Sequence, residues 1–164
     1  MTRRPTARLI LLGFALAGCG PPPKPGPPAP VAEVDAIELS VPSTIAENWD
    51  DNPGPDGVWA MVRCYKLTPK TTAVTVSGTL EFLLFEGRVE PADLAKTKPF
   101  RVWTYRPDEL PDYLYRHLLY GYRMQLAWVD RVPRTDVVTL TARYIPPSGE
   151  PIYALPVSIT MTAK

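Results

Sequence analysis

The chain has 164 residues, of which 45% are hydrophobic and 21% are charged, and these proportions are typical of one globular domain. Its 21 prolines do not indicate wholesale disorder, because seven of them fall within residues 20–30. The formal charge of +1 argues against a nucleic-acid-binding protein, which needs a clustered surplus of basic side chains.

Residues 1–18 follow the order of a bacterial export signal. A basic start without acidic residues leads into an apolar run at 9–16, far shorter than the ~20 residues of a permanent membrane helix. The run ends in Leu16-Ala17-Gly18-Cys19, which resembles the lipobox of bacterial lipoproteins. This resemblance implies cleavage before Cys19, a diacylglycerol on its sulfur and an acylated amine. A plain secretory leader with a coincidental cysteine and an uncleaved anchor are the alternatives.

The lipoprotein resemblance sets expectations for the cellular location of the protein and for the chemical state of its two cysteines. Gly20, in place of an aspartate, resembles the outer-membrane-sorted lipoproteins of some diderm bacteria. We therefore expect an exported protein, anchored by lipid to the outer membrane and facing the periplasm. Removing residues 1–18 takes away three arginines and leaves 15 basic against 17 acidic residues, a formal charge of −2. With Cys19 lipidated, Cys64 has no disulfide partner, and we expect it to be a small core residue.

Residues 19–30 are expected to be the lipidated cysteine and a linker. Proline lacks an amide donor and fixes its φ angle, so the sequence GPPPKPGPPAP at 20–30 excludes a helix or a central strand. In the polyproline II form, at ~3.1 Å per residue, these residues could hold a domain up to roughly 30–35 Å from a membrane. A short proline-rich ligand motif is the alternative interpretation of this segment.

Residues 31–164 are expected to form one mainly β domain. Hydrophobic residues alternate with polar ones at period two, which is typical of strands with one buried face. Such strands are predicted near 37–41, 57–67, 73–85, 100–105, 122–128, 138–144 and 155–161. This pattern of strands favours an antiparallel β-sandwich. The sandwich is expected to be immunoglobulin-like or similar, because the sequence lacks the pair of cysteines around a tryptophan that marks a true immunoglobulin domain.

One short helix is expected near 111–120. Pro111 suits a first helical position, and Gly121 is placed to end the helix. The only histidine of the chain, His117, falls among the mostly apolar residues that would line one face of this helix, and it is interpreted as a structural residue. The residues at helical spacing are Leu110, Tyr113, Leu114, His117 and Leu118.

The sequence offers no catalytic set, so we expect neither an enzyme nor a cofactor. One histidine and one sheltered cysteine cannot supply the three or four ligands of a zinc site. No GxSxG turn is present to carry a nucleophilic serine. Glu81, Glu86 and Asp130 could form a carboxylate pair for glycan hydrolysis, which is the least favoured alternative, because that chemistry needs a defined separation.

The loop at 50–57 weakly suggests calcium binding. Asp50, Asn52 and Asp56 place oxygen atoms at alternate positions. However, the sixth and twelfth positions counted from Asp50 are Pro55 and Met61, where a calcium loop of the EF-hand type has glycine and glutamate. We expect a turn-rich surface loop without a metal.

The segment from 101 to 123 is rich in aromatic residues and arginine, the types enriched at interaction hot spots. Its candidate binding surface consists of Trp103, Tyr105, Arg106, Tyr115 and Arg116. The alternative is that about half of these side chains fill the core. The sequence thus predicts a lipid-anchored, non-enzymatic binding or assembly module with an envelope protein or glycan as its partner. A structural component that self-associates is the alternative function.

Overall fold

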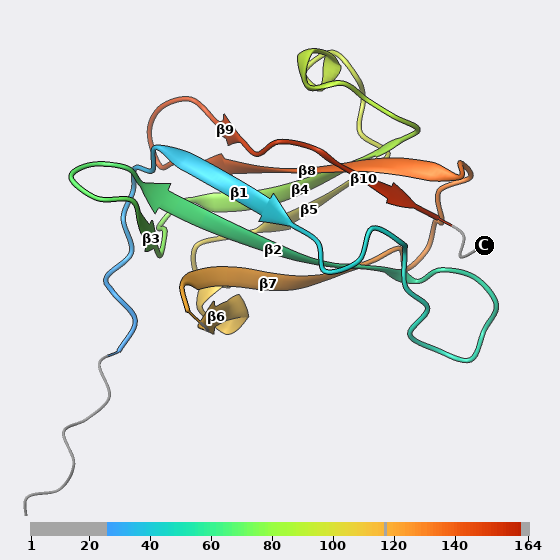
Figure 1. Ribbon diagram of the computed structural model, residues 1–164, viewed down its shortest axis with the longest axis horizontal. Helices are drawn as coiled ribbons and strands as arrows, with labels where there is room; N and C mark the ends of the chain where they lie inside the picture. Colours follow the sequence, from blue (N-terminus) through green and yellow to red (C-terminus); the bar gives the residue numbers. More distant parts are fainter. Residues whose placement is uncertain (1–25, 117, 162–164) are drawn as a thin grey trace, which may run out of the picture.

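The computed structural model describes residues 26–116 and 118–161, which form two antiparallel sheets (Figure 1). The predicted leader, Cys19 and His117 lie outside the described residues. The first sheet has the order β1 (Ala36–Ser40), β2 (Gly57–Lys66), β7 (Tyr120–Ala127), β6 (Leu114–Arg116), with β3 (Thr72–Val74) beside β2. The second has the order β10 (Val157–Thr160), β8 (Val137–Ile145), β4 (Thr79–Glu86), β5 (Arg101–Tyr105), with β9 (Ile152–Tyr153) beside β8. The predicted mainly β class is confirmed.

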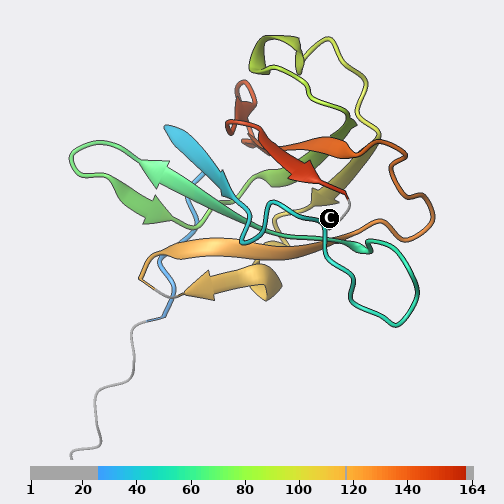
Figure 2. The ribbon, with the colours of Figure 1, turned by 45° about the vertical axis from the view of Figure 1, so that its right-hand side comes forward.

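Both sheets contribute side chains to one hydrophobic core, which gives a sandwich-like arrangement of two layers (Figure 2). On β2, alternate residues from Val58 to Cys64 are buried, as the period-two pattern predicts. The largest fully buried side chains include Trp128 directly after β7, Tyr144 from β8 and Phe82 from β4. Burying a side chain of this size stabilises the fold by about 1.5–3 kcal/mol. The two layers are therefore held together mainly by apolar contact.

The single strand predicted at 73–85 is wrong, because the structure contains two strands there. β3 pairs with β2 in one sheet, whereas β4 pairs with β8 and β5 in the other. Gly78 lies at the crossing, where a Cβ atom would overlap the carbonyl oxygen of Ile145. Val76 remains buried between the two strands, which explains why the alternation runs on through the crossing.

The helix predicted near 111–120 is also wrong. A short 3₁₀ turn, η2 (Leu110–Tyr113), leads directly into β6, which pairs with β7 as a hairpin. Glu109 caps the turn without a side-chain hydrogen bond, and so short a helix is marginal without tertiary support. The apolar residues at helical spacing do not share a face, because Leu110 is buried while Leu118 is 89% exposed. Pairing of aromatic-rich strands therefore overrides the helical spacing.

The N-terminal segment from Pro28 to Ala32 is fixed to the domain. The Thr75 hydroxyl donates to the carbonyl of Pro28 at 2.8 Å, and the Tyr144 hydroxyl donates to the carbonyl of Ala32 at 2.6 Å. Val31 forms an isolated parallel bridge with Val76.

Candidate binding surface

The structure divides the five residues of the predicted surface among three places. Trp103 and Tyr105 are half-buried on β5 and pack toward the core. The rings of Trp103 and Trp128 lie 6.0 Å apart, and the Trp103 Nε1 donates to the carbonyl of Ala127 at 3.3 Å. Tyr105 meets Tyr113 edge to face at 4.8 Å, and burial raises the pKa of Tyr105 to about 12. These two side chains therefore serve mainly as core.

Arg106 belongs to the loop after β5 and pairs with its own neighbours. Its Nε lies 3.7 Å from a carboxylate oxygen of Asp108 and 3.5 Å from one of Glu109. Tyr115 and Arg116 lie instead on β6, in the other sheet, where the Arg116 guanidinium is 5.3 Å from the ring centre of Tyr120. Of the five predicted residues, only Tyr115 is part of the larger surface described next, on the outer side of the same sheet.

That surface is the outer face of the β1-β2-β7-β6 sheet, which we name the aromatic–arginine face. Alternate residues of β2 point into the core, so the intervening residues point outward. The register places Met61 opposite Arg123 of β7, and Gly121 between Arg63 of β2 and Tyr115 of β6. The aromatic–arginine face consists of Trp59, Met61, Arg63, Tyr65, Tyr115 and Arg123.

Arg123 lies at the centre of a row of ring contacts across this face. Its Cζ atom is 4.5 Å from the ring centre of Trp59 and 5.9 Å from that of Tyr115. Trp59 in turn meets Trp49 of the β1–β2 loop at 6.2 Å, edge to face. Within 26–116 and 118–161, no carboxylate forms an ion pair with Arg123, which is exposed. Its guanidinium is thus oriented by aromatic rings while its charge stays uncompensated.

The other end of the face is held by polar contacts around Glu38 of β1. The Tyr65 hydroxyl donates to Glu38 Oε2 at 2.6 Å, and Arg63 Nη1 lies 3.7 Å from the same oxygen. Burial, followed by the bond to Glu38, raises the pKa of Tyr65 to about 12. Gly121 leaves room for the Arg63 chain, whose Cγ would be 3.1 Å from an added Cβ. The buried Arg63 Nε has no hydrogen-bond partner in the described part of the chain.

The loop at 50–57 uses its oxygen atoms to hold its own backbone. Asp56 Oδ2 accepts from the amides of Trp49 and Asp50, and Asp50 Oδ1 accepts from the amide of Asn52 at 2.8 Å. The described residues contain no group of three or more His, Cys, Asp or Glu side chains that could hold a metal ion. The loop instead fixes Trp49 over Gly57, beside the aromatic–arginine face.

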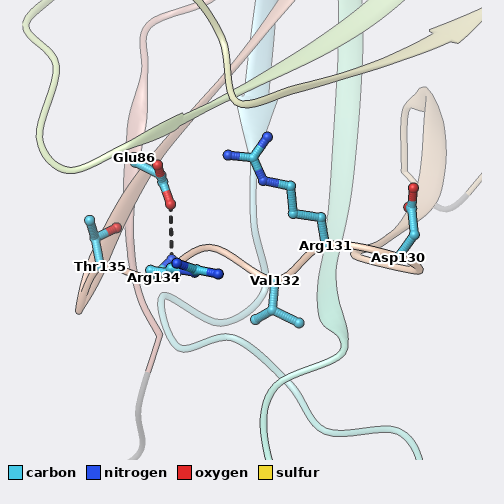
Figure 3. A pocket seen from close by; sticks show the side chains of 6 residues that line it. All are labelled: Glu86, Asp130, Arg131, Val132, Arg134 and Thr135. Atoms are coloured by element: carbon cyan, nitrogen blue, oxygen red, sulfur yellow. Dashed lines mark hydrogen bonds between the residues drawn. The ribbon is translucent and has the colours of Figure 1, made fainter.

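A second surface feature is an open depression of about 670 Å³ between the β4–β5 and β7–β8 connections (Figure 3). It is lined by Glu86, Asp130, Arg131, Val132, Arg134 and Thr135. Glu86 Oε1 accepts the amide of Arg134 at 2.9 Å, and Arg101 Nη2 lies 2.6 Å from Asp130 Oδ1. We name it the charged depression.

The carboxylates considered for glycan hydrolysis are all engaged with cationic or amide groups. The Glu81 side chain is 13% exposed, lies 2.6 Å from its cross-strand neighbour Arg143 on β8, and is outside the lining of the charged depression. Glu86 and Asp130 both line the depression. The hydrogen bond from Arg101 lowers the pKa of Asp130, whereas a general acid needs a raised pKa to hold its proton near neutrality. This geometry gives no support to an acid–base pair at Asp130.

No family model matches the chain, and no curated protein or solved structure matches it. Over 26–116 and 118–161, the structure has no helix of the length and apolarity that crossing a membrane requires. The described residues define a mainly β protein with two antiparallel sheets and a partly exposed aromatic–arginine face on the outer side of one of them.

Proposed function

We propose that the protein is a lipid-anchored component of the bacterial envelope whose β-sandwich, immunoglobulin-like or similar, is a non-enzymatic binding module. The observation that carries the binding role is Arg123, exposed and unpaired within the described residues, and held between Trp59 and Tyr115. Tryptophan, tyrosine and arginine dominate interaction hot spots because they bury large areas and make several hydrogen bonds. The aromatic–arginine face combines all three on a rigid sheet.

An envelope protein is the partner that this face fits best, with a glycan as the alternative. The stacked guanidinium presents its N–H groups edge-on to a carboxylate or to backbone carbonyls of a partner. A sugar would use the rings of Trp59 and Tyr115 but would leave the positive charge of Arg123 uncompensated.

The binding role is tested by replacing Arg123 with alanine. We expect R123A to reduce recovery of the cognate envelope protein by at least tenfold, because hot-spot truncations cost ~2 kcal/mol or more. The measurement is quantitative pull-down from envelope extract with the full chain as bait. R106A is the matched control, because it removes an exposed arginine whose charge is compensated by Asp108 and Glu109.

Recovery of the same proteins in equal amounts by R123A, R106A and the unmodified chain would contradict the proposal. Light scattering on the same samples separates a distinct partner from a second copy of this chain. A dimer that R123A dissolves would support the self-associating structural component instead.

The lipid anchor, supported by the resemblance of residues 16–19 to a lipobox, has its own test. We expect mass spectrometry of the protein from a bacterial host to show an acylated peptide that begins at Cys19. Cys19→Ser is expected to abolish both the lipid and the cleavage, because the thiol is the group that receives the diacylglycerol. A protein that retains Met1, or one cleaved elsewhere without lipid, would refute the anchor.

A further inference from the structure

The charged depression lies at the end of the domain opposite to the N-terminal segment. In Figures 1 and 2 the first described residues, drawn in blue, lie on the left, whereas the β4–β5 and β7–β8 connections lie toward the top and the right. A neighbouring depression of about 310 Å³ continues it along Lys98 and Phe100 and shares Glu86 and Arg131. We propose that this depression binds an oxyanion, either a carboxylate or a phosphate. The site is separate from the aromatic–arginine face and does not depend on its role.

The depression has a surplus of positive charge. Arg101 is compensated by Asp130 at 2.6 Å, and Glu86 is the other acidic side chain that lines the two depressions. The same two depressions are lined by three basic side chains, Lys98, Arg131 and Arg134, none of which forms an ion pair within the described ranges. Cationic side chains close together repel one another, and an anion between them relieves that repulsion.

Both unpaired arginines line this space, and the contacts that position them leave their guanidinium N–H groups free. The Arg131 guanidinium stacks on Phe100, with its Cζ 4.4 Å from the ring centre. Arg134 is placed through its backbone amide, which donates to Glu86 Oε1 at 2.9 Å. Figure 3 shows the Arg131 guanidinium between Glu86 and Asp130, and Arg134, seen nearly end-on, close to Glu86. Arginine suits this role because its planar fork matches the oxygens of carboxylate and phosphate groups.

The turn that carries the arginines is built on the core and is held in a strained conformation. Trp128 is buried at its start, and its carbonyl accepts the Arg131 amide at 3.3 Å. Val129 has a φ of +49° although its side chain is β-branched, and that side chain is 87% exposed. A residue of this kind adopts the left-handed region at a cost of about 1–3 kcal/mol. The surrounding contacts therefore fix the turn before any ligand arrives, which lowers the cost of binding.

The test is an NMR titration of the intact chain in non-ionic detergent, with glucuronate and inorganic phosphate as probes and glucose as the neutral control. We expect saturable shifts of the Arg131 and Arg134 Nε–Hε signals with at least one oxyanion, and none with glucose. R131A and R134A are each expected to weaken binding at least fivefold, since each removes a charge-assisted hydrogen bond. R106A is the control and should bind as the unmodified chain does.

Glu86→Gln provides the second arm, because it keeps an oxygen for the Arg134 amide and removes only the negative charge. We expect it to tighten oxyanion binding about threefold at low salt, by loss of a repulsive charge. The comparison of glucuronate with phosphate tells which oxyanion the depression prefers. Shifts that fail to saturate, that appear equally with glucose, or that persist unchanged in R131A and R134A would overturn the proposal.

Discussion

Replacing Gly78 with alanine is expected to lower the free energy of unfolding by about 3 kcal/mol, the range of severe overpacking. The added Cβ would overlap the backbone carbonyl oxygen of Ile145 and would lie 2.7 Å from the Tyr144 hydroxyl oxygen. A backbone oxygen cannot move aside alone, so the end of the β4–β8 pair would have to separate. Displacing Tyr144 would also disturb its hydrogen bond to Ala32, which helps to fix the N-terminal segment.

Urea denaturation of the intact chain, followed by tryptophan fluorescence, measures this effect. Gly26→Ala is the control, because nothing lies within 4 Å of the Cβ that it would add and no positive φ is involved. We expect that variant to stay within ~0.5 kcal/mol of the unmodified chain. A Gly78→Ala variant with the same midpoint and slope as the unmodified chain would show that the crossing between the sheets is looser than the structure indicates.

The strands that could be predicted from the sequence are those with one wholly apolar face. β2 shows this best, since Val58, Ala60, Val62 and Cys64 are all buried and the predicted 57–67 nearly coincides with Gly57–Lys66. Alternation also located β5, β7 and β8, whereas β4 was predicted only as part of a longer strand. Burial on one face is a local property of the sequence, so a period-two pattern is enough to reveal it.

The errors arose where pairing between distant residues decides the local structure. Alternation alone does not tell which sheet a strand joins, and so β3 and β4 were merged across Gly78. Leu110, Tyr113 and Leu114 do recur at helical spacing, but β6 instead forms a hairpin with β7, which pairs the backbone N–H and C=O groups that the two strands turn toward each other. Leu118 shows the difference most clearly, because it lies on the predicted apolar stripe and is exposed at the hairpin tip.

Only one member of the aromatic–arginine face, Tyr115, belongs to the binding surface predicted from the sequence. Arg123 lies in the same aromatic-rich segment, 101–123, but is not among the five predicted residues, and the other members of the face come from β2. The signal that could have found the rest was present in β2, whose outward positions carry Trp59, Met61 and Tyr65 where a solvated strand normally carries polar residues. Outward aromatic residues on a central strand are therefore the feature that marks the face.

Cys64 is expected to resist thiol reagents in the folded protein at pH 8 and to react only after unfolding. Its side chain is fully buried on β2, between β1 and β3, and burial raises its pKa from 9.0 to about 12. The reactive thiolate would be roughly 10% of an exposed thiol at pH 8, but only about 0.01% of this one. Ionisation is thus disfavoured about a thousandfold even before access is considered.

The measurement is the rate of iodoacetamide labelling in a Cys19→Ser background, so that Cys64 is the only thiol. We expect labelling at least a thousandfold faster in urea above the unfolding midpoint than in buffer. Because a reagent reaches Cys64 only when β2 separates from its neighbours, labelling at low urea should track the fraction unfolded. Rapid labelling in buffer, with the fluorescence of the folded state intact, would mean that this edge of the core opens without global unfolding.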